Sequence, residues 1–444
     1  ESGQANGQSE VLSSGLIKMT GINSVGIIGK KSKVTNSGTG TEGIEISGKD
    51  SAGILATDES EVINSGRIEG KTGTNLVGIS VDKNSTVSNS GTITMKTTSN
   101  TGISSTGGAV TNSGTITLEK DKSTGISSVN GNVTNSSGAT ITAQEGSSVG
   151  IYAEIAGNDN RNTYSAQNAG TISLTNATPA PSTLPEKSAA IYSLIGSGTG
   201  KLITTNSGTI DVDQKASVGI YAKNDGGARD NSDVTNSGLI NVKKTSSAGI
   251  LAEKAKVTNT GAGTTGGILL TAVKTAGIIG KAGSLVSNTG RIETSGVTPT
   301  VATDGLVGIS VDASTGTNTG EIKLGTKYST GMNGVASSNL TNSGTITGDK
   351  ENAVGMAVNA STATNANGGE IILNGLTSTG MFGETSSTVT NAGTIETKTA
   401  VPTGTATGLV GIAVNASTGT NTGEIKLGTK YSTGMFGAAS STVI

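Results

Sequence analysis

The sequence predicts an all-β protein, a right-handed parallel β-helix of about 16 coils with two to three short strands per coil. Two recurring phrases and an unusual composition support this prediction. The first phrase, T-N-S-G-T-I, occurs at 111–116, 205–210 and 341–346, and looser copies occur along the rest of the chain. Internal repetition of this kind is typical of solenoids, in which each repeat is one structural unit.

The second phrase is a small polar residue, a small or aliphatic residue, Gly, and then Ile or Met. It occurs 16 times, from Gly26 to Gly434, if Ala190 is counted in the place of the glycine. The spacing averages about 27 residues and falls to 23 in the most regular units, so longer units are a basic coil with insertions. A period near 24 residues suits about three strands per coil.

Each unit contains short β-branched runs separated by turn residues, such as V-T-N at 133–135 and 234–236. Such short strands are unstable alone, but strands stacked about 4.8 Å apart on like strands satisfy one another's backbone groups. The crossovers between parallel strands predict right-handed winding. We expect Asn and Gly to turn in the left-handed region, Asn side chains to stack as a hydrogen-bonded ladder, and Ile151, Ile191 and Ile220 to point inward.

Composition excludes several function classes. Of 444 residues, 69 are Gly, 2% are aromatic, and none is Cys, His or Trp. Histidine, the commonest general base and metal ligand, is therefore missing. We predict no metal, no cofactor and no catalytic residue. The net charge of −2 provides no basic surface for nucleic acid. No apolar run reaches the 18 residues of a membrane-spanning helix. We expect the sequence to be part of a longer chain.

We predict one β-helical segment over residues 1–444, with enlarged loops over 150–233 and tandemly duplicated regular coils over 305–444. The duplication is visible at 313–332, which is identical to 416–435. The enlarged loops lie at 154–167, 175–187 and 223–233. Because binding residues often lie on loops over a rigid scaffold, this region is the candidate partner-binding site.

The candidate residues of this site are of two kinds. Tyr152, Tyr192 and Tyr221 follow inward Ile residues and are expected to point outward as a column, where Tyr suits a protein or sugar contact. The alternative is that an insertion folds over the column and buries it. The loops contribute five further candidates: Asp159, Arg161, Tyr164, Arg229 and Asp230. The alternative is that these loops have no role in binding.

The pairing of T-N-S-G-T-I with S-V-G-I-Y-A at this period resembles the passenger regions of large fusobacterial autotransporter (type V) outer-membrane adhesins, of the galactose-inhibitable or arginine-inhibitable type. The resemblance covers essentially the whole sequence. It implies a passenger on the bacterial cell surface, attached to the outer membrane through a C-terminal barrel that lies outside this sequence. It also implies adhesion to other bacteria, to host glycans of the galactose type, and to host protein receptors, including inhibitory immune receptors.

Three functions remain open. The first is adhesion and virulence through the loops of 150–233. The second is a spacer rod that displays an adhesive tip located elsewhere, which the regular coils of 305–444 favour. The third is a glycan-cleaving β-helix enzyme, which would need converging carboxylates. Asp211 and Asp213 share one strand face but are expected to be a solvated pair. Trimeric coiled-coil adhesins are disfavoured because heptads are absent.

Overall fold

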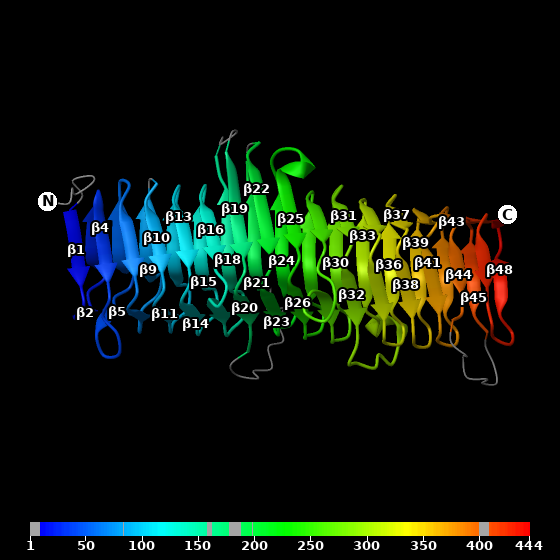
Figure 1. Ribbon diagram of the computed structural model, residues 1–444, viewed down its shortest axis with the longest axis horizontal. Helices are drawn as coiled ribbons and strands as arrows, with labels where there is room; N and C mark the ends of the chain where they lie inside the picture. The colour runs from blue at the N-terminus through cyan, green and yellow to red at the C-terminus, as the bar shows by residue number, and fades with distance from the viewer. Residues whose placement is uncertain (1–8, 83, 158–161, 177–187, 198, 399–407) are drawn as a thin grey trace. The chain divides into compact units, whose positions relative to one another are not determined.

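The protein is an all-β right-handed parallel β-helix, which confirms the predicted fold class. The structure, a computed structural model, describes residues 9–82, 84–157, 162–176, 188–197, 199–398 and 408–444. The chain divides into two compact units, residues 1–227 and 228–444, and each is described by itself. Every turn contributes one strand to each of three sheets, called A, B and C (Figure 1).

The first unit has eight turns in its described residues. Its sheet A strands, which precede the Asn-Ser-Gly turn, are β1 (Ser9–Ser13), β4 (Ser32–Asn36), β7 (Glu61–Asn64), β10 (Thr86–Asn89), β13 (Ala109–Asn112), β16 (Asn132–Asn135), β19 (Thr163–Asn168) and β22 (Lys201–Asn206). Its sheet B strands, which follow that turn, are β2 (Leu16–Met19), β5 (Gly43–Ile46), β8 (Arg67–Gly70), β11 (Thr92–Met95), β14 (Thr115–Leu118), β17 (Thr140–Ala143), β20 (Thr171–Leu174) and β23 (Thr209–Val212). Its sheet C strands, which carry the Gly-Ile phrase, are β3 (Val25–Lys30), β6 (Ala52–Thr57), β9 (Val77–Asp82), β12 (Thr101–Thr106), β15 (Thr124–Val129), β18 (Val149–Ile155), β21 (Ala189–Ile195) and β24 (Val218–Asn224).

The second unit repeats this arrangement and adds two short 3-10 helices, η1 (Arg229–Asn231) and η2 (Ala302–Asp304). Its sheet A strands are β25 (Ser232–Asn236), β28 (Lys256–Asn259), β31 (Leu285–Asn288), β34 (Thr315–Asn318), β37 (Asn339–Asn342), β40 (Thr362–Asn365), β43 (Thr388–Asn391), β46 (Thr418–Asn421) and β49 (Thr442–Val443). Its sheet B strands are β26 (Leu239–Val242), β29 (Gly267–Leu270), β32 (Arg291–Thr294), β35 (Glu321–Leu324), β38 (Thr345–Gly348), β41 (Glu370–Leu373), β44 (Thr394–Glu396) and β47 (Glu424–Lys426). Its sheet C strands are β27 (Ala248–Glu253), β30 (Ala276–Lys281), β33 (Val307–Asp312), β36 (Thr330–Val335), β39 (Val354–Asn359), β42 (Thr379–Glu384), β45 (Val410–Asn415) and β48 (Thr433–Gly437).

Stacked strands pair in parallel with like residues opposite like residues. In sheet C, for example, Ile103 pairs with Ile126, and Ile126 pairs with Ile151. All three side chains are fully buried. Burial of an aliphatic side chain of this size stabilises the fold by roughly 1.5–3 kcal/mol. Because the strands contain only two to seven residues, this stabilisation accumulates across turns rather than within one.

The Asn residues that end the sheet A strands form a continuous side-chain ladder within each unit, as predicted. In the first unit Asn89 Nδ2 donates to Asn112 Oδ1 over 2.7 Å, and Asn112 Nδ2 donates to Asn135 Oδ1 over 2.8 Å. In the second unit Asn318 bonds Asn342 in the same way over 2.8 Å. These side chains are buried, so the ladder satisfies polar groups that water does not reach.

The prediction that these Asn-Ser-Gly turns use the left-handed backbone region is wrong. Neither Asn89 nor Gly91 has a positive φ. The left-handed residues lie instead two positions before most sheet C strands, as in Asn75 (φ 58°) and Asn352 (φ 59°), and at the C-to-A corner, as in Asn130 (φ 52°). The glycine is required for space, because a Cβ on Gly91 would lie 2.0 Å from the carbonyl oxygen of Gly66 in the adjacent turn.

Candidate partner-binding surface

A column of three tyrosines stands on the outer face of sheet C in the first unit. Tyr152, Tyr192 and Tyr221 occupy the same register on β18, β21 and β24. Each follows a fully buried isoleucine, so alternation along the strand turns the ring away from the core. These strands have seven residues, whereas the other sheet C strands of this unit have six. All three tyrosines are half-buried, so the rings are neither covered nor fully free.

The rings contact one another directly. Tyr192 and Tyr221 are stacked, with ring centroids 4.7 Å apart and planes 9° apart. Tyr152 meets Tyr192 edge to face, with centroids 5.4 Å apart and planes at 77°. Both arrangements are favourable for aromatic pairs and hold the rings in place. The column is therefore a preformed aromatic surface.

Glu154 fixes the Tyr152 end of the column. The Tyr152 hydroxyl donates a hydrogen bond of 2.7 Å to Glu154 Oε2, two residues along the same strand. Partial burial raises the pKa of Tyr152 above its usual value, and the bond to the Glu154 carboxylate raises it further. The phenol thus stays protonated at neutral pH and acts as a donor. Leu194 and Lys223 lie in register with Glu154 on the next two strands, so acidic, apolar and basic groups border the column.

The predicted loop candidates fall in three different places. Asp159 and Arg161 lie outside the described residues, as does most of 175–187. Tyr164 belongs to β19 in sheet A rather than to a loop, and its hydroxyl accepts a 3.2 Å hydrogen bond from Asn162 Nδ2. Arg229 and Asp230 form η1 of the second unit and pair with each other through Nε and Oδ1 at 3.0 Å. The structure therefore brings the three tyrosines together, while the role of all eight residues in binding remains a prediction.

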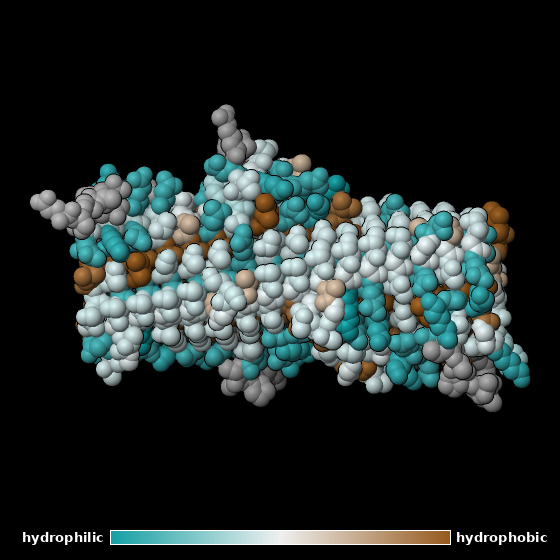
Figure 2. All heavy atoms as spheres, in the orientation of Figure 1, coloured by the Kyte–Doolittle hydropathy of each residue, from teal (hydrophilic) through white to brown (hydrophobic). Residues whose placement is uncertain are grey.

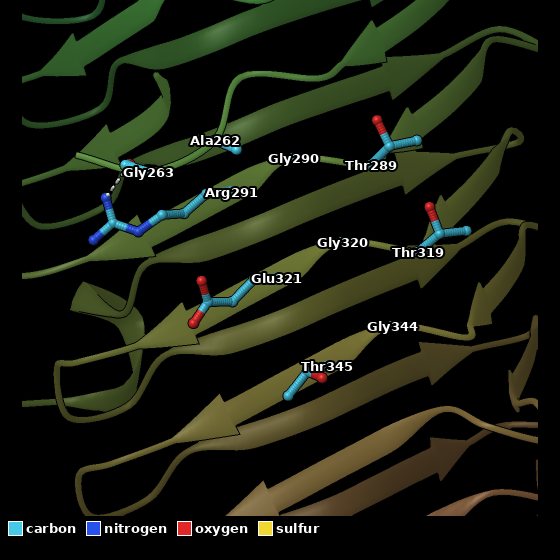
Figure 3. A pocket seen from close by; sticks show the side chains of 10 residues that line it. All are labelled: Ala262, Gly263, Thr289, Gly290, Arg291, Thr319, Gly320, Glu321, Gly344 and Thr345. Carbon is cyan, nitrogen blue, oxygen red and sulfur yellow. Dashed lines mark hydrogen bonds between the residues drawn. The ribbon is translucent and has the colours of Figure 1, made fainter. Parts of the chain in front are cut away.

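A shallow groove that the sequence analysis did not anticipate runs along the A-to-B turns of the second unit (Figure 3). Its volume is about 450 Å³, and stacked glycines such as Gly290, Gly320 and Gly344 line it. Arg291 borders the groove and donates to the carbonyl oxygen of Gly263 over 3.1 Å, while Glu321 and Thr345 follow on the next two strands (Figure 3). The surface along this edge is mainly near-neutral in character (Figure 2).

The first unit has a groove of the same construction, with a volume of about 400 Å³. Arg67 takes the place of Arg291 and donates from Nε to the carbonyl oxygen of Glu42 over 3.1 Å. The shared sequence signal was visible: V-T-N-S-G-T-G at 34–40 matches V-T-N-T-G-A-G at 257–263, and S-G-R-I-E at 65–69 matches T-G-R-I-E at 289–293. The stacked glycines of both grooves pack against backbone of the neighbouring turn, so packing alone explains them. Gly40 and Gly263 are different, because they have open space at the Cβ position and a positive φ of 63° and 70°.

The least exposed carboxylates in the described part of the first unit are engaged in ion pairs. Glu45 and Glu69 lie on adjacent strands of sheet B and are both bound by Arg67 and Lys71, and Lys96 also binds Glu69. Hydrogen bonds from Lys71 and then Arg67 lower the pKa of Glu45. Asp211, on β23, and Asp213, just after it, are half-buried on the outside of another turn. Within the described ranges no three acidic residues come together in a way that could hold a metal ion.

Three strands per turn, a buried aliphatic core and continuous side-chain ladders define a parallel β-helix repeat protein. The family model of the BigA third pectate lyase-like domain matches residues 2–132 and, a second time, residues 124–265, which together are more than half of the sequence. The chain therefore belongs to this family, whose members are β-helix domains of large bacterial surface proteins.

The other two comparisons add no relative. No curated protein and no solved structure matches this chain. Over the described residues, none of the helices has the length and apolar character needed to cross a membrane.

Proposed function

We propose that this chain is a passenger segment of a cell-surface adhesin and that the tyrosine column of sheet C contacts its partner. The observation that carries this proposal is the preformed aromatic surface of Tyr152, Tyr192 and Tyr221. Ordered aromatic rings supply a large contact area at a small entropic cost, and Tyr is enriched among residues that dominate binding energy. The β-helix beneath them holds the rings at fixed spacing, which lowers the cost of binding further.

Membership of the family supports a location on the cell surface. The partners and the membrane anchor are further parts of the proposal. The partners we propose are host-cell glycans of the galactose type, host protein receptors, including inhibitory immune receptors, and other bacteria. The anchor we propose is the outer membrane, as in the fusobacterial autotransporter adhesins that the repeats resemble. We propose no enzymatic activity, since the least exposed carboxylates among the residues that the structure describes, Glu45 and Glu69, are neutralised by Arg67, Lys71 and Lys96.

The experiment that tests the proposal is binding of the purified chain to a panel of host glycans and immune receptor ectodomains. The variant in which Tyr152, Tyr192 and Tyr221 are all changed to Ala should lose binding. The matched control changes Ser80, Ser104 and Ser127 to Ala, because these residues hold the same register on β9, β12 and β15. Unchanged binding by the tyrosine variant, with both variants folded, would move the site elsewhere.

The second candidate function is a spacer that holds an adhesive region away from the cell. It is favoured by the tandemly duplicated coils of the second unit, in which the sequence of residues 313–332 recurs at 416–435. A chain of identical turns sets distance without needing a binding site. Absence of binding by both the parent chain and the control variant would favour this spacer function.

A further inference from the structure

The three tyrosines of the column do not present the same surface to a partner. Tyr192 and Tyr221 occupy adjacent strands in register and are stacked with their planes only 9° apart. Their ring faces therefore point along the direction in which the turns are stacked. One face of Tyr192 lies against Tyr221, and the edge of Tyr152 meets the other. Both faces of Tyr192 are thus covered by neighbouring rings, and a partner reaches only its edge.

Tyr152 is turned by about a right angle. Its plane makes 77° with that of Tyr192, so it runs along the stacked turns rather than across them. The Tyr152 hydroxyl reaches Glu154 Oε2, two residues along β18, so the long axis of the ring leans along the strand. A plane that contains both directions lies along the surface of sheet C. Tyr152 therefore turns one ring face toward the sheet and the other toward solvent, in agreement with its half-burial.

Glu154 holds this orientation and places a carboxylate beside the ring. Its Oε2 accepts the Tyr152 hydroxyl over 2.7 Å. Its Oε1 has no hydrogen-bond partner among the residues that the structure describes, and solvent reaches it. The adjacent turn has Gly196 at this point, where even a Cβ would lie 3.4 Å from Oε1. A ligand that lies on the Tyr152 ring therefore meets a carboxylate oxygen that can accept a hydrogen bond.

Ser127 borders the same ring from the preceding turn. It holds register with Tyr152 on β15, and its hydroxyl is accessible to solvent. An aromatic face between two hydrogen-bonding groups matches a pyranose sugar, whose C–H face packs on the ring while its hydroxyls reach the groups on either side. The ring face carries partial negative charge and so attracts the weakly positive C–H groups of the sugar.

We propose that Tyr152 and Glu154 form a subsite for one neutral sugar ring of a glycan, and that Glu154 excludes sugars with an acidic group at that place. A hydroxyl of the neutral sugar donates to Glu154 Oε1. A carboxylate or sulfate in the same place faces the Glu154 carboxylate, and like charges placed opposite each other oppose binding strongly. Tyr192 is a positioning residue that supports the Tyr152 ring. This inference rests on the proposed function, because it assigns the glycan partner to one end of the tyrosine column.

The test of selectivity uses the 444-residue chain and an array of neutral oligosaccharides, each beside its counterpart with a terminal sialic acid. The parent chain should prefer the neutral member of a bound pair by about 10-fold or more. Glu154→Gln keeps the shape of the side chain and an oxygen for the Tyr152 hydroxyl but removes the charge, so it should abolish most of this preference. Glu253→Gln is the matched control, because Glu253 follows Leu251 on β27 as Glu154 follows Tyr152 on β18, with no aromatic ring beside it.

The test of the ring compares the two ends of the column. Tyr152→Ser should abolish binding of the neutral glycan, whereas Tyr221→Ser should retain most of it. Ser127 shows that serine fits this register one turn away from Tyr152, so the first variant is expected to fold. Circular dichroism during heating checks that both variants are folded.

The outcomes separate this inference from the proposed function. The inference is overturned, while the adhesive column stands, if both serine variants lose binding equally or if Glu154→Gln keeps the full preference for neutral glycans. It is also overturned if the parent chain binds protein receptors but no neutral glycan. Absence of binding to every glycan and receptor on the panel overturns the inference and the proposed function together.

Discussion

Asn112 and Asn135 lie directly above one another in adjacent turns, and the Asn112 side-chain amide donates to the Asn135 side-chain oxygen over 2.8 Å. The same amide also donates to the carbonyl oxygen of Gly114 in its own turn, at 3.3 Å. One buried side chain therefore links two turns and closes the corner between sheets A and B. The recurrence of Asn at this corner follows from these two bonds.

Replacement of one member of the ladder should destabilise its neighbourhood. Asn112→Ala leaves the Asn89 amide without its acceptor and Asn135 without its donor. An unsatisfied buried polar group costs about 1–3 kcal/mol, and two are affected. Chemical denaturation of the variant measures the loss. Thr111→Ala, which changes an exposed residue of the same strand, is the control and should fall within about 0.5 kcal/mol of the parent chain.

The glycine of the same corner should tolerate no side chain. Gly91→Ala places a methyl group 2.0 Å from the carbonyl oxygen of Gly66, so the two turns must separate. Overpacking of this kind costs roughly 1–3 kcal/mol. Gly15→Ala is the control, because only Glu42 Oε2 lies near its Cβ position, at 4.0 Å. Equal melting temperatures for the two variants would contradict the stacking account of this corner.

A charge on the inner face of sheet C should disrupt the turn that carries it. Ile220 is fully buried, and Ile220→Asp would place a carboxylate among the core aliphatics. Burial of an unpaired charge is among the largest single destabilising effects, and we expect a loss of at least about 3 kcal/mol. Circular dichroism during heating measures it. Ser207→Asp adds the same charge at an exposed site of the same turn and should melt close to the parent chain.

The ion-pair network of sheet B should make the first unit sensitive to acid. The pKa of Glu45 is lowered in the folded state by Lys71 and Arg67, so its contribution to stability is present above the unfolded pKa of about 4.3. This contribution is lost as the pH falls through the lowered folded pKa. Melting temperatures measured from pH 7 down to pH 2 should therefore fall below about pH 4.

Alkaline solution affects the same network through Lys96. Its pKa is raised, mainly by the hydrogen bond to Glu69, so its contribution is complete below the unfolded pKa of about 10.4 and is lost as the pH rises through the raised folded pKa. Glu45→Gln should reduce the fall in melting temperature below about pH 4 and leave the fall at alkaline pH in place. The exposed Glu10→Gln serves as the control. An identical fall at acid pH in both variants would show that Glu45 is not responsible.

The sequence by itself determined the fold class, the length of the coil, the inward isoleucines and the Asn ladder. These features depend on residues that recur at a fixed period. The period can be recognised in the sequence alone, because each turn contacts only its neighbours and so needs the same residues at the same positions. The outward register of Tyr152, Tyr192 and Tyr221 followed from alternation along a strand. Their mutual geometry did not, since stacking at 4.7 Å or edge contact at 5.4 Å depends on rotamers that neighbouring turns select.

Only the tertiary structure decided where the backbone turns and why glycine recurs. The phrase Asn-Ser-Gly reads as a left-handed turn, yet Gly91 is there because Gly66 of the adjacent turn lies too close for a Cβ. Local sequence cannot reveal a clash between residues 25 positions apart.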